Sequence, residues 1–352
     1  MEVKMNIVVL CGGISSERDV SLSSGTMVSQ ALRNLGHCVI TLDLFFGYTP
    51  DNGKLEINTL FDSGYGSGNA AVAEQVPDLD ALRALRPDGS HIGDNVFEIC
   101  KAADIVFIAL HGSDGEDGKI QGAFDLLGIK YTGSGSFGSA LAMNKSVAKQ
   151  LFAAHGINTP RGIVLRRGDN TMDGSVGFPC VVKPNSGGSS VGASIVETSN
   201  EYVVALREAF RFDNEVIVEQ YIKGRECSVG IIGGRVLPPI EIIPQDGFYD
   251  YKNKYQAGVA LEVCPADFTE ELTQKLSDET AAVFDTLLLD VCARIDFIVD
   301  SGGEIWCLEA NTLPGMTPTS LMPQEAAAVG TGYDTLIDLI LRESLKKYGE
   351  NV

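Results

Sequence analysis

Residues 293–315, ARIDFIVDSGGEIWCLEANTLPG, contain two strand-like runs on either side of a Ser-Gly-Gly sequence. A two-residue Gly302-Gly303 turn of type I′ is predicted, because glycine accepts positive φ angles at both positions. This turn closes a hairpin over residues 292–311. Since side chains alternate along a strand, one face of the hairpin is polar and carries Arg294, Asp296, Glu309 and Asn311. The other face is apolar and is predicted to be core: Ile295, Phe297, Val299, Trp306, Leu308 and Ala310.

The polar face of this hairpin has an unusual pairing of charges. Its register places Asp296 opposite Glu309, and Arg294 opposite Asn311. Two carboxylates directly opposite each other repel, whereas two acids and an amide form an oxygen-only set that suits Mg²⁺. The alternative is a solvated strand face on which the arginine pairs with one of the acids.

Upstream, residues 178–192, FPCVVKPNSGGSSVG, run from a predicted strand into a glycine- and serine-rich loop. Glycines allow backbone N–H groups to converge on an anion, and Lys183 supplies positive charge at the end of the strand. A plain flexible loop is the alternative. The chain has no GxxxxGK[ST] sequence, so a P-loop fold is not expected. The GxGxxG match at 133–138 lacks the acid about 20 residues later that a dinucleotide site requires.

The length of 352 residues and the amino-acid composition favour a multidomain α/β protein. Forty-seven acids against 27 bases give a net charge of −20, which argues against nucleic acid or an anionic membrane as partner. Neither a signal peptide nor a membrane span is expected, because the sequence has no apolar run of about 20 residues and its start lacks the signal-peptide pattern. Eight scattered cysteines without a CxxC pair indicate free thiols and a cytoplasmic location.

The order of predicted elements divides the chain into three domains. Residues 1–133 alternate strands and helices, which predicts a parallel sheet, with a surface insertion at about 47–95. Residues 134–219 predict an antiparallel sheet backed by helices. Residues 220–352 hold further strands, the hairpin, a closing helix over 332–347 and an irregular segment at 245–258. One helix is predicted over 138–154, with Lys149 on its solvated face. His111 ends a buried strand, where a parallel sheet exposes its carboxyl edge.

Seven ordered sequences resemble the D-alanine–D-alanine ligases of the ATP-grasp superfamily, from residue 6 to about 345. They are GGISSERDVSLSSG, ALHGSDGEDG, YTGSGSFGSALAMNK, VVKPNSGGSSVG, YDYKNKY, ARIDF and EANTLPGMTPTSL. The resemblance implies an ATP-grasp fold with an N-terminal Rossmann-like domain. It also implies ligation of two D-alanines through a D-alanyl phosphate, for peptidoglycan precursor synthesis.

The resemblance assigns roles to residues of the two amino-acid subsites. Glu17 would hold the first ammonium, with His111 nearby, and Ser189 and Tyr255 would form a hydrogen-bond chain with Glu17. Arg294 and the N–H of Gly315 would stabilise the oxyanion. Ser320 and Leu321 would hold the second carboxylate.

The resemblance also implies how ATP and metal would bind. Two Mg²⁺ ions, or Mn²⁺ ions in their place, would lie on Asp296, Glu309 and Asn311. A lid at 245–258 would place Lys254 against the transferred phosphate. The remaining ATP contacts would be Lys145, Lys183, Ser189, Ser190, Glu219, Gln220, Ile222, Glu226, Phe248 and Leu308.

Several alternatives stay open at this point. The KNKY and TPTSL sequences favour D-alanine over D-lactate as acceptor, while D-serine is excluded less firmly. Another ATP-grasp carboxylate–amine ligase and a nucleotide-binding regulator with an eroded site are further possibilities. The SDG after His111 and the 47–95 segment depart from the family pattern. A homodimer is implied by the resemblance alone.

Overall fold

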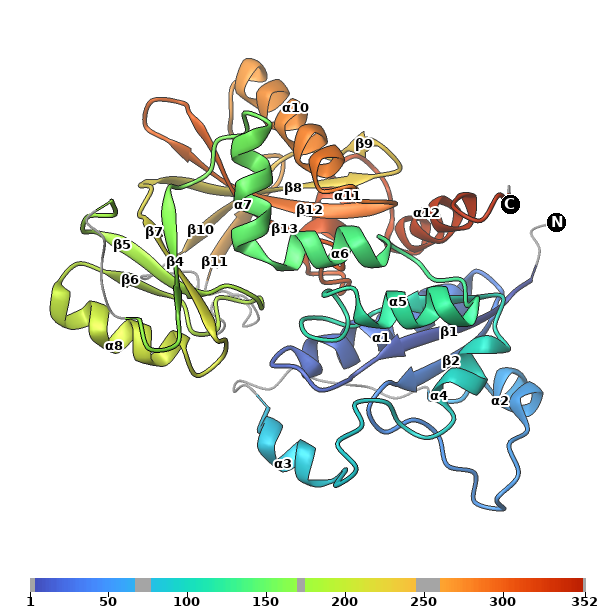
Figure 1. Cartoon of the computed structure of the whole chain (residues 1–352). Helices are drawn as coiled ribbons and strands as arrows, with labels where there is room; N and C mark the ends of the chain where they lie inside the picture. The colour runs from blue at the N-terminus through green and yellow to red at the C-terminus, as the bar shows by residue number, and fades with distance from the viewer. Residues whose placement is uncertain (1–3, 67–76, 170–174, 245–259, 351–352) are drawn as a thin grey trace.

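The structure, a computed structural model, describes residues 4–66, 77–169, 175–244 and 260–350. Within these residues the strands form three sheets, one from each successive part of the chain. Figure 1 shows the N-terminal sheet on one side of the molecule and the two antiparallel sheets on the other. None of the described helices is long and apolar enough to cross a membrane. All eight cysteines are free thiols, as predicted.

The N-terminal sheet is parallel, which confirms the prediction. Its strands are β1 (Asn6–Cys11), β2 (Cys38–Asp43) and β3 (Ile105–Ile108), in the order β2-β1-β3. The helices of this region are α1 (Arg18–Asn34), α4 (Val96–Lys101) and α5 (Lys119–Leu127). Because β3 ends at Ile108, His111 lies three residues beyond the carboxyl edge of the sheet.

The segment at 47–95 is only partly a surface insertion. It holds two short helices, α2 (Ile57–Ser63) and α3 (Leu79–Ala84). Leu60 and Phe61 of α2 are buried in a core cluster with β2 residues. A parallel bridge between Gly47 and Asp94 closes the segment at its base. The weak periodicity of the sequence concealed this contribution to the core.

The middle sheet is antiparallel, also as predicted. It consists of β4 (Gly162–Arg166), β5 (Cys180–Pro184), β6 (Ser194–Val196) and β7 (Glu215–Gln220), in the order β4-β7-β5-β6. Helix α8 (Ser199–Ala209) packs against it. Residues of β5 and β7 alternate between this core and the opposite face, which is the face that lines the cavity described below.

The single helix predicted over 138–154 is two helices, α6 (Ser136–Met143) and α7 (Lys145–Ala154). Asn144 separates them in an extended conformation, and its side chain accepts a hydrogen bond from the N–H of Val147. This is the usual role of asparagine at a helix N-cap. Both helices pack their apolar faces on the C-terminal sheet through Ala142, Ala148 and Phe152.

The C-terminal sheet has the order β11-β10-β8-β12-β13, with β9 paired to β8. Its strands are β8 (Gly224–Ile232), β9 (Arg235–Val236), β10 (Ile240–Pro244), β11 (Ala260–Val263), β12 (Cys292–Asp300) and β13 (Ile305–Asn311). Helices α10 (Glu270–Thr286), α11 (Leu321–Ala328) and α12 (Tyr333–Lys346) complete this part. Helix α12 packs against α1 in one core, so the end of the chain closes the N-terminal domain.

The hairpin keeps its predicted pairs at one end and loses them at the other. Arg294 lies opposite Asn311 and Asp296 opposite Glu309, as expected, but Phe297 lies opposite Cys307. Leu308 is therefore the extra residue of a β-bulge. The turn is a three-residue loop over 301–303, in which only Gly303 has a positive φ of 83°. The predicted type I′ turn is wrong.

The bulge changes which side chains enter the core. Cys307 and Ile305 are buried there, whereas Trp306 and Leu308 lie on the other side of the strand. The prediction that Trp306 and Leu308 are core residues is therefore wrong. Leu308 instead lines a cavity; its assignment as an ATP contact stays a prediction.

Candidate functional site

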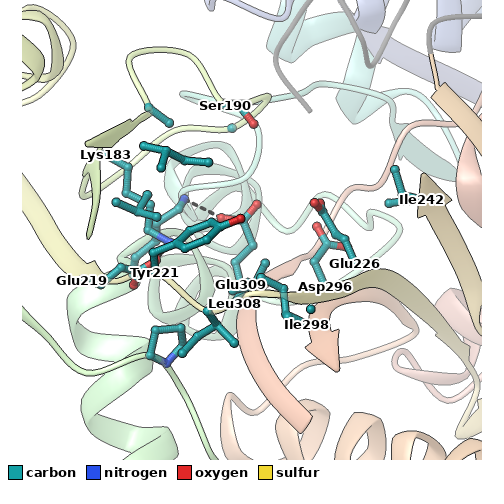
Figure 2. Close-up of a pocket in the computed structure, with 18 of the residues that line it drawn as sticks. Lys183, Ser190, Glu219, Tyr221, Glu226, Ile242, Asp296, Ile298, Leu308 and Glu309 are labelled. Carbon is teal, nitrogen blue, oxygen red and sulfur yellow. Dashed lines mark ion pairs between the residues drawn. The ribbon is translucent and has the colours of Figure 1, made fainter. Parts of the chain in front are cut away.

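A cavity of ≈ 390 Å³ lies between the middle and C-terminal sheets. Figure 2 shows side chains from both sheets facing it. Many of the residues predicted to bind ATP or metal line it: Lys145, Lys183, Ser190, Glu219, Gln220, Ile222, Glu226, Asp296, Leu308 and Glu309. The structure thus brings together residues that are up to 164 positions apart in the sequence, from Lys145 to Glu309.

Lys145 connects the glycine-rich loop to the polar face of the hairpin. Its ammonium lies 3.0 Å from a carboxylate oxygen of Glu309 and donates to the carbonyl of Gly187 at 2.6 Å. The residue is 8% exposed, so this charge pair is largely shielded from solvent. The contact places a cation, an acid and the loop at one point of the cavity wall.

A buried triad of charges forms another part of the wall. Glu219 lies between two lysines, with Lys183 at 2.6 Å and Lys149 at 2.7 Å. Burial raises the pKa of Glu219, but Lys183 and Lys149 outweigh that effect and hold the pKa below its usual value. Burial lowers the pKa of Lys149. The prediction that Lys149 is solvated is wrong, since its side chain is only 11% exposed.

The glycine-rich loop reaches across to the N-terminal domain. The hydroxyl of Ser189 donates a short hydrogen bond to Oε1 of Glu17, and both residues are buried. Ser189 and Ser190 have positive φ angles of 53° and 55°, which non-glycine residues seldom adopt and which are typical of functional loops. A Cβ on Gly188 would lie 2.8 Å from Glu17 Oε2, so a larger residue there would have to displace that carboxylate.

The four polar residues of the hairpin lie together, as predicted. Both oxygens of Asp296 accept from Arg294 at 2.9 Å, and Asn311 donates to Asp296 at 2.9 Å. The hydroxyl of Ser228 donates to the same carboxylate at 2.6 Å. Arg294 therefore occupies the positions on Asp296 that a metal ion would need.

The donor set nevertheless fits a hard cation. Asp296 and Glu309 are cross-strand neighbours that both line the cavity, and carboxylate and amide oxygens are ligands of Mg²⁺. No cluster of three or more His, Cys, Asp or Glu side chains suited to a metal occurs among the described residues. A metal site here would thus depend on two carboxylates and the Asn311 amide, with the guanidinium displaced from Asp296.

His111 lies in a buried hydrogen-bond chain that joins the N-terminal domain to the segment after the hairpin. Nδ1 lies 2.8 Å from the carbonyl of Leu313, and Nε2 lies 3.0 Å from the hydroxyl of Ser24. Because a carbonyl only accepts, Nδ1 carries the proton and Nε2 accepts from Ser24. Ser24 also accepts from the N–H of Met316 at 3.3 Å. Burial lowers the pKa of His111 and so favours this neutral form.

This neutral histidine predicts a dependence of stability on pH. The pKa of His111 is lower in the folded than in the unfolded chain, where it is about 6.5. The unfolded chain therefore binds the extra proton, and the free energy of unfolding falls by up to about 1.4 kcal/mol per pH unit below that value. Urea denaturation from pH 8 to 5.5 should show a shallower fall in His111→Gln than in the wild type. Equal slopes in the two proteins would contradict the assignment.

Glu116 is a site residue that the sequence analysis missed. Its oxygens accept from the N–H of Gly112 at 2.8 Å and of Leu313 at 3.2 Å, next to the His111 chain. Burial and the charge of Glu17 raise the pKa of Glu116 to about 8. It stands in the acidic SDGEDG sequence, where no local pattern distinguishes it from the neighbouring acids. The sequence feature that could have indicated a role for Glu116 is its position five residues after His111, at the carboxyl end of β3.

The remaining predicted residues fall into two groups. A Cβ on Gly315 would lie 2.9 Å from Ser320 Oγ, so these two residues are neighbours, and Leu321 begins α11 beside them. The direction of the Gly315 N–H stays a prediction. Phe248, Lys254 and Tyr255, with the rest of the predicted lid, lie outside the described residues.

Comparisons with known proteins agree with this geometry. Two family models match the chain: "D-ala D-ala ligase N-terminus" over residues 6–134 and "D-ala D-ala ligase C-terminus" over residues 151–342. The D-alanine--D-alanine ligase of Lacticaseibacillus casei (strain BL23) is 44% identical, over 99% of this chain and 98% of its own. That of Pediococcus pentosaceus is 42% identical, over 98% and 99%. A crystal structure of the Bacillus anthracis enzyme complexed with ATP is 31% identical, with a TM-score of 0.75 over 98% and 99%.

Proposed function

This chain belongs to the D-alanine–D-alanine ligase family, and we propose that it joins two D-alanines into D-alanyl-D-alanine while ATP becomes ADP and phosphate. It has the ATP-grasp fold and is an ATP-dependent ligase. The product serves peptidoglycan precursor synthesis in the cytoplasm. The observation that carries the proposal is the position of Lys145. It contacts both Glu309, on the polar face of the hairpin, and Gly187, in the glycine-rich loop, at one cavity.

In the first step, a carboxylate oxygen of one D-alanine attacks the γ-phosphorus of ATP, and ADP leaves. The product is a D-alanyl phosphate. Phosphoryl transfer depends mainly on positioning and on neutralisation of charge. Lys145 and Lys183 lie at the cavity and supply positive charge there. Asp296, Glu309 and Asn311 would hold two Mg²⁺ ions, or Mn²⁺, which when bound neutralise phosphate oxygens.

In the second step, the amine of the other D-alanine attacks the acyl carbon. The tetrahedral oxyanion collapses, the C–O bond to phosphate breaks, and the amine loses its extra proton. Arg294 and the N–H of Gly315 would stabilise the oxyanion, since preorganised donors are the main source of such stabilisation. Ser320 and Leu321 would hold the acceptor carboxylate. A lid over 245–258 would exclude water from the acyl phosphate.

Glu17 is the proposed anchor for the ammonium of the first D-alanine. It is 6% exposed and hydrogen-bonded to Ser189, so it is an oriented negative charge in a partly dry environment, where charge interactions are strong. His111 and Glu116 both interact electrostatically with Glu17. Their hydrogen bonds to the backbone of Leu313 fix the loop after β3 to the segment that contains Gly315.

Phosphate release from Mg-ATP tests the proposal, with D-alanine, D-lactate, D-serine and bicarbonate supplied singly and in pairs. D-Alanine alone should give one phosphate per dipeptide. Turnover with D-alanine plus D-serine or D-lactate, but little with D-alanine alone, would favour the alternative acceptor ligases. No turnover with D-alanine would refute the proposal. Sedimentation of the same sample tests the homodimer that the family resemblance implies.

Ser189→Ala should weaken the first amino-acid subsite. Hydrogen bonds to charged groups contribute about 1.5–3 kcal/mol, so kcat/KM for D-alanine should fall by about 10- to 100-fold. The variant Ser199→Ala, at the exposed start of α8, is the control and should match the wild type. A Ser189→Ala enzyme with unchanged kcat/KM for D-alanine would show that the contact with Glu17 does not serve the substrate.

A further inference from the structure

Glu325 is a buried acid that none of the roles above uses. It lies in the middle of α11 and is 0% exposed. Its Oε1 accepts a hydrogen bond from the N–H of Gly230 at 3.1 Å. Its Oε2 is buried and has no hydrogen-bond partner among the described residues. A carboxyl group is costly to bury in this way, so its position needs an explanation.

The neighbouring strand explains where this carboxyl group lies. Gly230 of β8 pairs with Arg294 of β12. The Gly230 N–H donates to Glu325 and its carbonyl accepts from Leu237 at 2.8 Å. Because these groups bond away from β12, the pair with Arg294 is of the non-hydrogen-bonded kind, in which side chains stand closest.

Gly230 also leaves a notch that Glu325 fills. A Cβ on Gly230 would lie 2.5 Å from Glu325 Oε2. The carboxyl group of Glu325 therefore takes the place of a side chain at position 230. It lies next to Arg294, on the same face of the sheet as Asp296 and the cavity.

The surroundings of Glu325 favour its uncharged form. Burial raises the pKa of Glu325 well above its usual value; Asp296 raises it further, while Arg294 and the Gly230 N–H lower it. Cys227 of β8 and Cys264, after β11, are the other titratable neighbours that interact with it. The raised pKa favours the neutral acid, which accepts the Gly230 N–H without competing with Asp296 for the guanidinium of Arg294.

Glu325 also stands one helical turn after Leu321. Residues i and i+4 of a helix share one face and move together. The start of α11 carries Ser320, whose hydroxyl accepts from Thr317 at 3.1 Å and touches Gly315. A shift of Glu325 in its notch would consequently move the Ser320–Leu321 pair relative to Arg294.

We propose that Glu325 is a positioning residue of the second amino-acid subsite. By filling the notch at Gly230, it fixes α11 against β8 and so sets the distance between Ser320–Leu321 and Arg294. This inference rests on the proposed function, in which the acceptor carboxylate binds at Ser320 and Leu321. Misplacement of such groups by about 1 Å can cost two orders of magnitude in rate.

Calorimetric binding of D-alanyl-D-alanine in the presence of ADP tests this role without turnover. Glu325→Ala should weaken dipeptide affinity and raise the KM for the acceptor D-alanine by about tenfold each, as expected for lost positioning. Its affinity for ATP should stay within about twofold, since the notch lies outside the ATP contacts. Glu325→Gln keeps the shape and the acceptor for Gly230, and should restore dipeptide affinity to within about threefold of wild type.

A second variant, Gly230→Ala, tests the same inference in case Glu325→Ala does not fold. Gly230→Ala adds a Cβ that must displace the carboxyl group, and should reproduce the selective loss of dipeptide affinity. Glu343→Gln, ion-paired with Lys346 on α12, is the control. Unchanged dipeptide affinity in Glu325→Ala would overturn the inference. So would a loss of ATP affinity as large as the loss of dipeptide affinity, accompanied by a lower Tm, because it would indicate general destabilisation. A wild-type chain that makes no dipeptide would instead refute the proposed function.

Discussion

Glu309→Gln is expected to reduce dipeptide formation by about 10³-fold or more while the protein stays folded. The change removes one negative charge from the proposed metal site, and metal ions supply several kcal/mol of transition-state stabilisation. The side chain of Glu309 is 19% exposed at the cavity and lies 3.0 Å from Lys145, so an amide of the same shape fits there. Phosphate release at saturating Mg-ATP and D-alanine measures the loss, and circular dichroism checks the fold.

Glu304→Gln is the matched control for this variant. Glu304 lies in the same hairpin but is exposed and outside the cavity. It should retain wild-type turnover. A Glu309→Gln protein that unfolds would show that Glu309 has a structural role, and one that keeps turnover would remove it from the metal site.

Glu219→Ala should give the largest loss of stability among single substitutions in the middle sheet. The change leaves the ammonium groups of Lys149 and Lys183 buried without their common partner. Removal of one member of a buried ion pair costs about 3–5 kcal/mol, because the remaining charge is uncompensated. Urea denaturation should show the midpoint lowered accordingly, and ATP binding should weaken because Lys183 lines the cavity.

Glu208→Ala provides the comparison for Glu219→Ala. Glu208, near the end of α8, forms an exposed i,i+3 pair with Arg211, just after the helix, and such pairs contribute less than about 1 kcal/mol. If Glu219→Ala were no more destabilising than Glu208→Ala, the two lysines would have to be neutral or solvated in the folded protein. That result would contradict the buried triad.

The hairpin shows how far alternation and turn chemistry predict a site. Asp296 and Glu309 were placed opposite each other from the sequence, and the structure agrees. The bulge at Leu308 was not predictable, because it lies in an apolar run where a shift by one residue exchanges side chains of similar hydrophobicity. The turn is one residue longer than predicted, which shifts the pairing by one position. The extra residue Leu308 in β13 shifts it back, so the pairs beyond the bulge, Asp296 with Glu309 and Arg294 with Asn311, are the predicted ones.

Residues whose environment is set by distant strands were not predictable from local pattern. Lys149 has the helix position of a surface lysine, and its ion pair with Glu219 of β7, 70 positions later, depends on the tertiary fold. Glu325 likewise reads as an ordinary helical acid in SLMPQEAAA. Its partner is a missing side chain at Gly230, which no periodicity reveals. In a chain with a net charge of −20, Lys145 and Lys183 line one cavity, and Arg294 is bonded to Asp296 of the same cavity.

The central claim is that one D-alanine is activated as an acyl phosphate at this cavity. The most direct test uses D-alanine labelled with ¹⁸O in both carboxylate oxygens, Mg-ATP and the wild-type protein, with mass spectrometry of the phosphate and dipeptide. The attacking carboxylate oxygen should leave with the phosphate, so each dipeptide formed should release one phosphate that carries one ¹⁸O. Dipeptide formed with unlabelled phosphate would contradict the mechanism.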